Sequence, residues 1–158
     1  MLRQKTQERK ATLNQTPDAT DEEKATAIAK VNSELAKVQQ QINTEHTSQG
    51  VNSVKANAMT AIEQITAQAI EKETARDAVK QKANEQKQLI LANNNATDDE
   101  KNAAQAQVDA KLAEEIQNVN NADTNAQVDN VKSKAITAIS AINAQPHKRQ
   151  DAINSLIA

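Results

Sequence analysis

The 158-residue sequence lacks cysteine and aromatic residues, and it contains one glycine and two prolines. Absence of cysteine excludes disulfide bonds, and absence of aromatics removes the side chains that dominate most cores. The formal net charge is −2, so the basic surface that nucleic acids and anionic membranes attract is missing. No apolar run approaches the roughly 20 residues that span a bilayer. We therefore expect no nucleic-acid partner and no membrane insertion in this fragment.

What is abundant is Ala, Asn, Gln, Lys and Glu, a composition that favours helices. One 24-residue segment occurs twice, as ATDEEKATAIAKVNSELAKVQQQI from Ala19 and as ATDDEKNAAQAQVDAKLAEEIQNV from Ala96. The offset between the two copies is therefore 77 residues. The first ten residues lack the apolar core of a signal peptide, and the chain starts and ends partway through a repeat. It is expected to be a piece of a longer array.

Each copy of the segment opens with the pattern of a capping box. Thr20 with Glu23, and Thr97 with Glu100, have the Thr-x-x-Glu spacing in which the hydroxyl and the carboxylate satisfy each other's backbone amides. We predict that these four residues are structural helix caps. Residues 45–50 are expected to form a polar turn before the next helix.

Apolar residues recur at spacings of three and four, which predicts amphipathic helices that pack on one another. The fold class is therefore all-α, with tandem three-helix-bundle repeats of about 77 residues arranged as an elongated rod. The expected domains are a first repeat, truncated at its N-terminus, in residues 1–68, a second in 69–145, and the first helix of a third in 146–158. The predicted core stripe consists of Val31, Leu35, Val38, Ile42, Val54, Ile62, Ile65, Val108, Leu112, Val119, Val131, Ile139 and Ile142.

Residues with catalytic or metal-binding chemistry are few. His46 and His147 occupy non-equivalent places in the repeat and are expected to be solvated loop residues, since no second histidine or cysteine stands near either for a zinc site. The oxygen-rich residues 18–23 are the nearest candidate for a Ca²⁺ site, but they lack the glycine and spacing of an EF-hand. We expect no catalytic, cofactor-binding or metal-binding residues, no cofactor and no enzymatic activity.

Three stretches carry a family resemblance: the ATDDEK helix start, VDAKLAEE at 108–115, and VDNVKSKAITAISAINAQP at 128–146. Together with the repeat period, they resemble a domain of unknown function that recurs in giant staphylococcal cell-wall-anchored surface proteins of the Ebh, SasC and FmtB type. The first copy departs from that pattern at Ala69, where a proline is expected. The resemblance implies an extracellular location on the bacterial cell surface, with wall anchoring through regions outside this fragment, and roles in adhesion, biofilm and virulence. It supplies no set of binding residues.

Three functions are compatible with the sequence. In the first, the repeats form a stalk or spacer that projects an adhesive region from the cell wall and extends under force, with neighbouring repeats of the same chain as partners. In the second, the repeat is itself an adhesive module that binds a host extracellular-matrix or serum protein, or self-associates in cell aggregation. The third is a cytosolic stress protein that folds only on desiccation, but the caps and apolar stripes favour folding in ordinary buffer.

Overall fold

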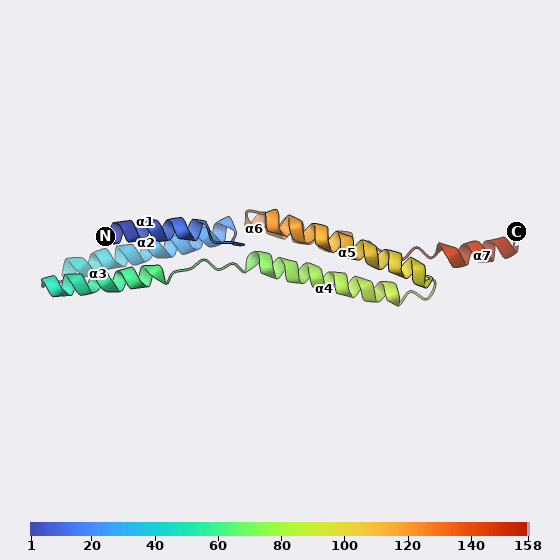
Figure 1. Cartoon of the computed structure of the whole chain (residues 1–158), viewed down its shortest axis with the longest axis horizontal. Helices are drawn as coiled ribbons and strands as arrows, with labels where there is room; N and C mark the ends of the chain where they lie inside the picture. Colours follow the sequence, from blue (N-terminus) through green and yellow to red (C-terminus); the bar gives the residue numbers. More distant parts are fainter. Residues whose placement is uncertain (158) are drawn as a thin grey trace. The chain divides into compact units, whose positions relative to one another are not determined.

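The computed structural model describes residues 1–157, and these residues contain seven α-helices and no strand (Figure 1). They divide into two compact units, Met1–Ile70 and the part that begins at Glu71. The all-α fold built of tandem helical repeats is thereby confirmed. The helices are α1 (Leu2–Asn14), α2 (Asp21–Thr44), α3 (Ser48–Glu63), α4 (Glu71–Leu91), α5 (Asp98–Asn121), α6 (Asn125–Ser140) and α7 (His147–Ile157).

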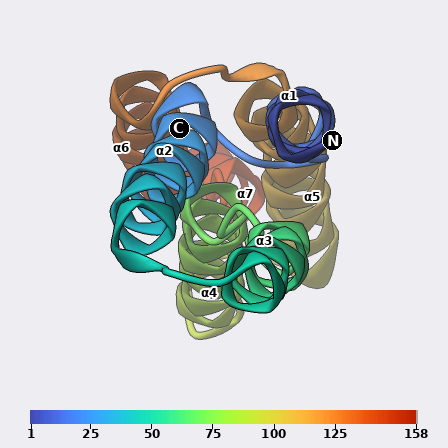
Figure 2. The same cartoon turned by 90° about the vertical axis from the view of Figure 1, so that its left-hand side faces the viewer.

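The first unit is a bundle in which α1, α2 and α3 each contact the other two (Figure 2). Its core is small, because its largest fully buried side chains are Leu13 and Ile62, followed by Val31 and Val38. Alanine fills much of the remaining interior, and Leu2, Ile28 and Ile65 pack at its edge. In such a core, each buried methylene-sized group contributes about 0.8 kcal/mol of transfer free energy, and no aromatic side chain adds to the buried surface.

The second unit repeats this arrangement with α4, α5 and α6, which again contact one another pairwise. Its interior is more extensive because α4 has 21 residues whereas α1 has 13. One cluster surrounds Val108 and Ile139, and a second surrounds Val119 and Val128. With three antiparallel helices, the chain enters this unit at one end of the bundle and leaves it at the other (Figure 1).

The helices end between repeats even where no proline or glycine requires it. α3 stops at Glu63 and α4 starts at Glu71, although the intervening residues include neither Pro nor Gly. In the second repeat, α6 stops at Ser140 and Pro146 immediately precedes α7.

The polar turn expected at residues 45–50 is shorter than predicted. α3 already begins at Ser48, because the Thr47 hydroxyl accepts a hydrogen bond from the Gly50 backbone N–H at 2.9 Å and so caps the helix. Gly50 therefore lies in the first helical turn, and its φ is not positive.

The residues of the predicted core stripe face the bundle interiors to different degrees. Some are fully buried and the others are half-buried, and this difference does not follow their position along the helix. The buried members are Val31, Val38, Ile62, Val108, Val119 and Ile139; the half-buried members are Leu35, Ile42, Val54, Ile65, Leu112, Val131 and Ile142. Within residues 1–157, no helix combines the length and apolar character needed to cross a membrane.

Candidate functional site at the repeat ends

The start of α2 is held by a reciprocal pair of hydrogen bonds. The Thr20 hydroxyl accepts from the Glu23 backbone N–H at 3.3 Å, and Glu23 Oε1 accepts from the Thr20 backbone N–H at 2.9 Å. Thr20 is fully buried. The two bonds satisfy amides that a helix start otherwise leaves without a partner.

The start of α5 has the same geometry. The Thr97 hydroxyl accepts from the Glu100 backbone N–H at 3.3 Å, and Glu100 Oε1 accepts from the Thr97 backbone N–H at 2.9 Å. The backbone dihedral angles of the two cap residues agree, with φ −75° and ψ 166° in each. Both repeats therefore have the same capping box at the start of their middle helix.

The second carboxylate oxygen of each capping glutamate accepts hydrogen bonds from backbone N–H groups further along the chain, beyond the third helix of its repeat. Glu23 Oε2 accepts from the Ile70 backbone N–H at 2.9 Å. Glu100 Oε2 accepts from the backbone N–H groups of His147 at 2.7 Å and Lys148 at 3.0 Å. Ile70 and His147 are equivalent at the 77-residue offset, so in each repeat one glutamate side chain caps a helix and also accepts from the backbone at the same repeat position.

These bonds affect the acid–base equilibrium of Glu100. Hydrogen bonds donated by the backbone N–H groups of Thr97, Lys148 and His147 favour the ionised carboxylate and lower the pKa of Glu100 from 4.5 to about 2. Desolvation opposes this shift. The carboxylate is therefore charged at neutral pH, and its charge lies at two helix N-termini, where the helix dipole favours an anion.

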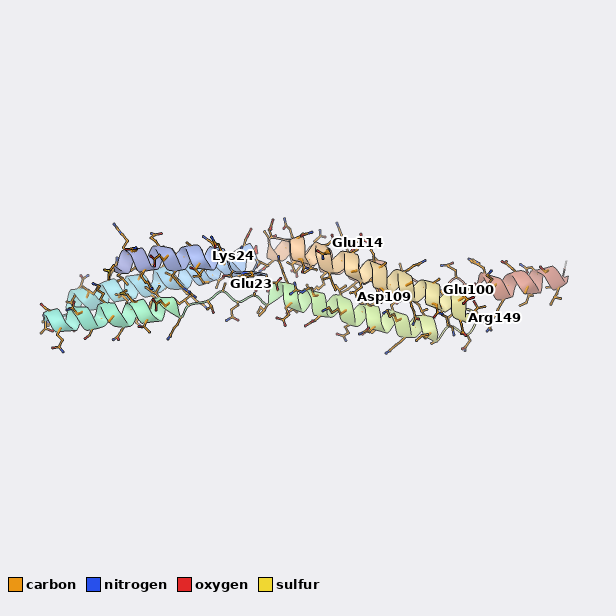
Figure 3. All side chains as sticks on the ribbon, in the orientation of Figure 1. Glu23, Lys24, Glu100, Asp109, Glu114 and Arg149 are labelled. Atoms are coloured by element: carbon orange, nitrogen blue, oxygen red, sulfur yellow. The ribbon has the colours of Figure 1, made fainter. Side chains whose placement is uncertain are left out.

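A second contact fixes α7 to the same region. Arg149 Nη1 donates to the backbone oxygen of Asn94, in the loop before α5, at 2.7 Å. Figure 3 shows Glu100 and Arg149 together at this end of the unit. The beginning of α7 is consequently tied to the α4–α5 loop and to the cap of α5.

A long polar side chain of the first helix in each repeat holds the end of the third helix. In the first unit, Arg9 Nε and Nη2 donate to the backbone oxygen of Ile65 at 2.9 and 2.6 Å. In the second, Gln86 Nε2 donates to the backbone oxygen of Ile142 at 2.6 Å. Arg9 and Gln86 are equivalent at the 77-residue offset, so two different side chains satisfy the same carbonyl position.

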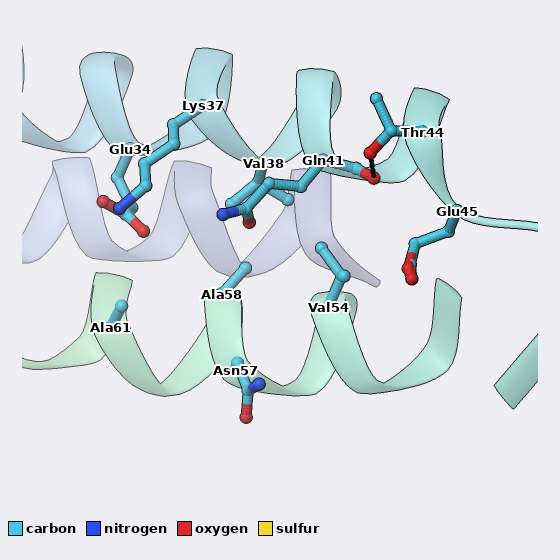
Figure 4. Close-up of a pocket in the computed structure, with 10 residues that line it drawn as sticks. All are labelled: Glu34, Lys37, Val38, Gln41, Thr44, Glu45, Val54, Asn57, Ala58 and Ala61. Atoms are coloured by element: carbon cyan, nitrogen blue, oxygen red, sulfur yellow. Dashed lines mark hydrogen bonds between the residues drawn. The ribbon is translucent and has the colours of Figure 1, made fainter. Parts of the chain in front are cut away.

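A groove of about 450 Å³ runs between α2 and α3 (Figure 4). Its rim is polar and of mixed charge, with Glu34, Lys37, Gln41 and Asn57 around a floor that includes Val38. No set of three or more His, Asp or Glu side chains within residues 1–157 is grouped to hold a metal ion. The groove presents no cluster of convergent catalytic groups.

Sequence patterns alone left two of these contacts unassigned. The partners of Glu23 Oε2 and Glu100 Oε2 lie 47 residues or more further along the chain, so no local pattern indicates them. The buried hydrogen bond of Gln86 could have been predicted from the sequence, because this polar residue lies on the apolar stripe of its helix between Ala83 and Ile90. A polar residue on such a stripe indicates a buried hydrogen bond.

Fold and site together define a tandem helical repeat protein in which each repeat carries the same helix cap. The family model described as Domain of Unknown Function (DUF1542) matches residues 1–70 and 71–147. The chain belongs to this family, which is found in staphylococcal surface proteins, and it carries two tandem copies of the domain. No curated protein and no solved structure matches the chain.

Proposed function

We propose that this chain is part of the stalk of a bacterial cell-surface adhesin, anchored to the cell wall through other regions and acting as a spacer. Its role is structural and not catalytic. The observation that carries the proposal is the odd number of helices in each bundle. Because the chain enters α4 at one end of the bundle and leaves α6 at the other, repeats placed in series add length.

The shared caps support the same role. In each repeat a single glutamate bonds both to the start of the middle helix and to the backbone that leads into the next first helix. Features that recur at the 77-residue offset include the caps, core positions and the contacts at Arg9 and Gln86. A repeat that preserves its core and the hydrogen bonds at its helix ends is suited to transmit tension along the chain.

The small, alanine-rich interiors suggest that the repeats also extend under load. Without aromatic side chains, each unit has little buried surface to resist unfolding. An unfolded repeat of 77 residues reaches roughly 250 Å at full extension. Unfolding of one unit would therefore lengthen the stalk while its neighbours stay folded.

Single-molecule force spectroscopy tests this proposal. The chain, held between two handles, should give two unfolding events of similar length, at forces below those that rupture the attachment bonds. The matched control is Ile139→Ala, which should lower the unfolding force of one event and leave the other unchanged. A chain that stays folded until the handles detach would contradict the extensible spacer.

An adhesive role gives a different result in a binding experiment. Fibronectin, fibrinogen, collagen and albumin would be immobilised and the chain passed over them at physiological salt. The spacer predicts no saturable binding at tens of micromolar. Saturable binding to one of them would favour the adhesive module instead.

A further inference from the structure

The linker between α3 and α4 is bound at both ends by side chains of the first unit. Residues 65–70 belong to no helix (Figure 1). At one end of the linker, Arg9 Nε and Nη2 donate to the backbone oxygen of Ile65 at 2.9 and 2.6 Å. At the other end, Glu23 Oε2 accepts from the backbone N–H of Ile70 at 2.9 Å. We refer to these two contacts as the linker clamp.

The linker clamp uses the backbone groups that a helix through the linker would need. In an α-helix, the Ile65 oxygen would accept from the Ala69 N–H. The two donors of Arg9 fill both acceptor positions of that oxygen. The Ile70 N–H would donate to the Thr66 oxygen, but its single proton is already bound by the clamp. The clamped linker and a continuous helix therefore exclude each other.

The linker sequence is compatible with a helix. Residues 64–70 read QITAQAI, with neither proline nor glycine, and Ala and Gln are good helix formers. The helical spacing of three and four also continues from the inward face of α3 through the linker to that of α4. The positions on this stripe, all buried or half-buried, are Ile62, Ile65, Ala69, Lys72, Ala75 and Val79. A continuous helix would therefore keep the buried side chains of α3 and α4 on one face.

The second repeat lacks this freedom because of Pro146. This proline stands where the first repeat has Ala69. A proline has no N–H, and in a helix its ring clashes with the carbonyl four residues earlier, which here is that of Ile142. Ala144 is 4% exposed and belongs to the core of its unit, whereas its counterpart Ala67 is only half-buried. Burial and the proline thus hold the second linker, and the first depends more on its clamp.

We propose that the linker after the first repeat is a two-state element. Release of the clamp converts residues 64–70 to helix and joins α3 and α4 into one helix from Ser48 to Leu91. Seven residues span up to about 23 Å when extended and about 10 Å as a helix, so the two states differ in length. Arg9 and Glu23 are positioning residues that select the extended state. The proposal does not depend on the stalk role, because it concerns the backbone conformation of one linker.

A matched pair of substitutions at Arg9 tests this proposal in the full chain. Arg9→Met keeps a long unbranched side chain and removes the donors, whereas Arg9→Gln retains a donor of the kind that Gln86 uses in the second unit. Backbone carbon chemical shifts report helix residue by residue. Arg9→Met should raise the helical population of residues 64–70 by at least about tenfold, because hydrogen bonds from a charged donor are lost. Arg9→Gln should retain the shifts of the parent chain.

The other end of the clamp gives an independent test. Glu23→Gln leaves one acceptor oxygen where the carboxylate serves the N–H groups of both Thr20 and Ile70. It should therefore also increase the helical population of residues 64–70. Ala69→Pro, added to either clamp variant, should return these residues to non-helical shifts, because it introduces the proline of the second repeat.

The second repeat supplies the internal control. Gln86→Met removes the donor to the Ile142 oxygen, which is the counterpart of the Arg9 contact. Because Pro146 forbids a helix at this place, residues 141–146 should not become helical.

Four results would overturn the proposal. Residues 64–70 would stay non-helical in both Arg9→Met and Glu23→Gln, although amide signals show a folded bundle. Arg9→Gln would produce as much helix as Arg9→Met, which would show that charge and not hydrogen bonding holds the linker. Gln86→Met would make residues 141–146 equally helical, so the proline would not distinguish the repeats. If one clamp variant unfolds the first unit, the other decides the outcome, and unfolding by both would show that the clamp maintains the bundle and not the linker.

Discussion

The backbone N–H of His147 donates to Glu100 Oε2 at 2.7 Å, although the two residues lie 47 positions apart. The contact requires the ionised carboxylate, whose pKa is lowered to about 2 in the folded chain from 4.5. A carboxyl group with a depressed pKa stabilises the folded state above its unfolded-state pKa. This stabilisation should be complete above about pH 4.5 and should be lost as the pH falls through 2.

Glu100→Gln should therefore lower the stability of the second unit at pH 7 and make it less dependent on pH between 5 and 2, since the amide carries no charge and only one acceptor oxygen. Urea unfolding at a series of pH values measures this effect. The matched control is Asp129→Asn, at an exposed position of α6, which should leave the pH profile close to that of the parent. Equal profiles for Glu100→Gln and the parent would contradict the assigned role of the carboxylate.

Removal of the cap hydroxyl should destabilise α5. Thr97→Ala leaves the Glu100 backbone N–H without its side-chain acceptor and should lower the free energy of unfolding by about 1 kcal/mol. Thr97→Ser retains the hydroxyl and should cost much less. The midpoint and slope of urea denaturation distinguish the two variants, and an identical loss in both would indicate that the methyl group matters instead.

Gln86→Ala should be more costly than an alanine substitution on the surface of the same helix. Gln86 is 3% exposed, and its loss would leave the Ile142 carbonyl without this donor. An unsatisfied buried polar group costs about 1 to 3 kcal/mol. Gln88→Ala, at an exposed position two residues further on, serves as the control and should change stability by less than about 0.5 kcal/mol.

Ile139→Ala should strongly destabilise the second unit. Ile139 is fully buried in a core whose other buried members are Ile90, valines and alanines, and truncation of a buried isoleucine costs about 2 to 5 kcal/mol. Amide hydrogen exchange should show lost protection in α4, α5 and α6 with protection retained in α1, α2 and α3. Ile153→Ala, in exposed α7, should have no measurable effect. Loss of protection in both units would show that they unfold together.

Gly50→Ala should stabilise the first unit. Gly50 lies in the first turn of α3 with an ordinary φ, so alanine should gain about 0.5 to 1 kcal/mol from its lower unfolded-state entropy. The added Cβ would lie 2.8 Å from Glu45 Oε1, but this contact involves only the flexible end of the Glu45 side chain. Thermal unfolding in Glu45→Ala and parental backgrounds measures the gain and isolates the contact. Destabilisation in both backgrounds would contradict the prediction.

The helical fold could be predicted because its determinants are local. The apolar spacing of three and four places Val31 and Val38 on one face of α2 whatever the rest of the chain does. A capping box spans three residues, so the Thr97 and Glu100 pattern is sufficient to locate a helix start. The beginning of α3 was predicted less well, because the hydroxyl of Thr47 caps it without the acidic partner of a full box.

The contacts that hold the helix ends in place could not be predicted in this way. Whether α3 continued into the next repeat was open, since residues 64–70 are compatible with a helix in composition. The bond from Ile70 to Glu23, 47 residues earlier, exists only because the bundle returns the chain to the start of α2. Similarly, Arg9 and Gln86 have little in common as residue types, and only their place in the bundle gives them one role.

The sequence by itself determined the repeat period, because two segments of it are similar, and also the helical class and the starts of α2 and α5, because these depend on residues within one or two turns of one another. The tertiary structure decided which amide the second oxygen of Glu23 and of Glu100 binds, and which carbonyl Arg9 and Gln86 hold. These depend on where segments about 50 residues apart are brought together by packing. Contacts between segments so far apart leave no periodic pattern in the sequence, so they can be identified only in the folded bundle.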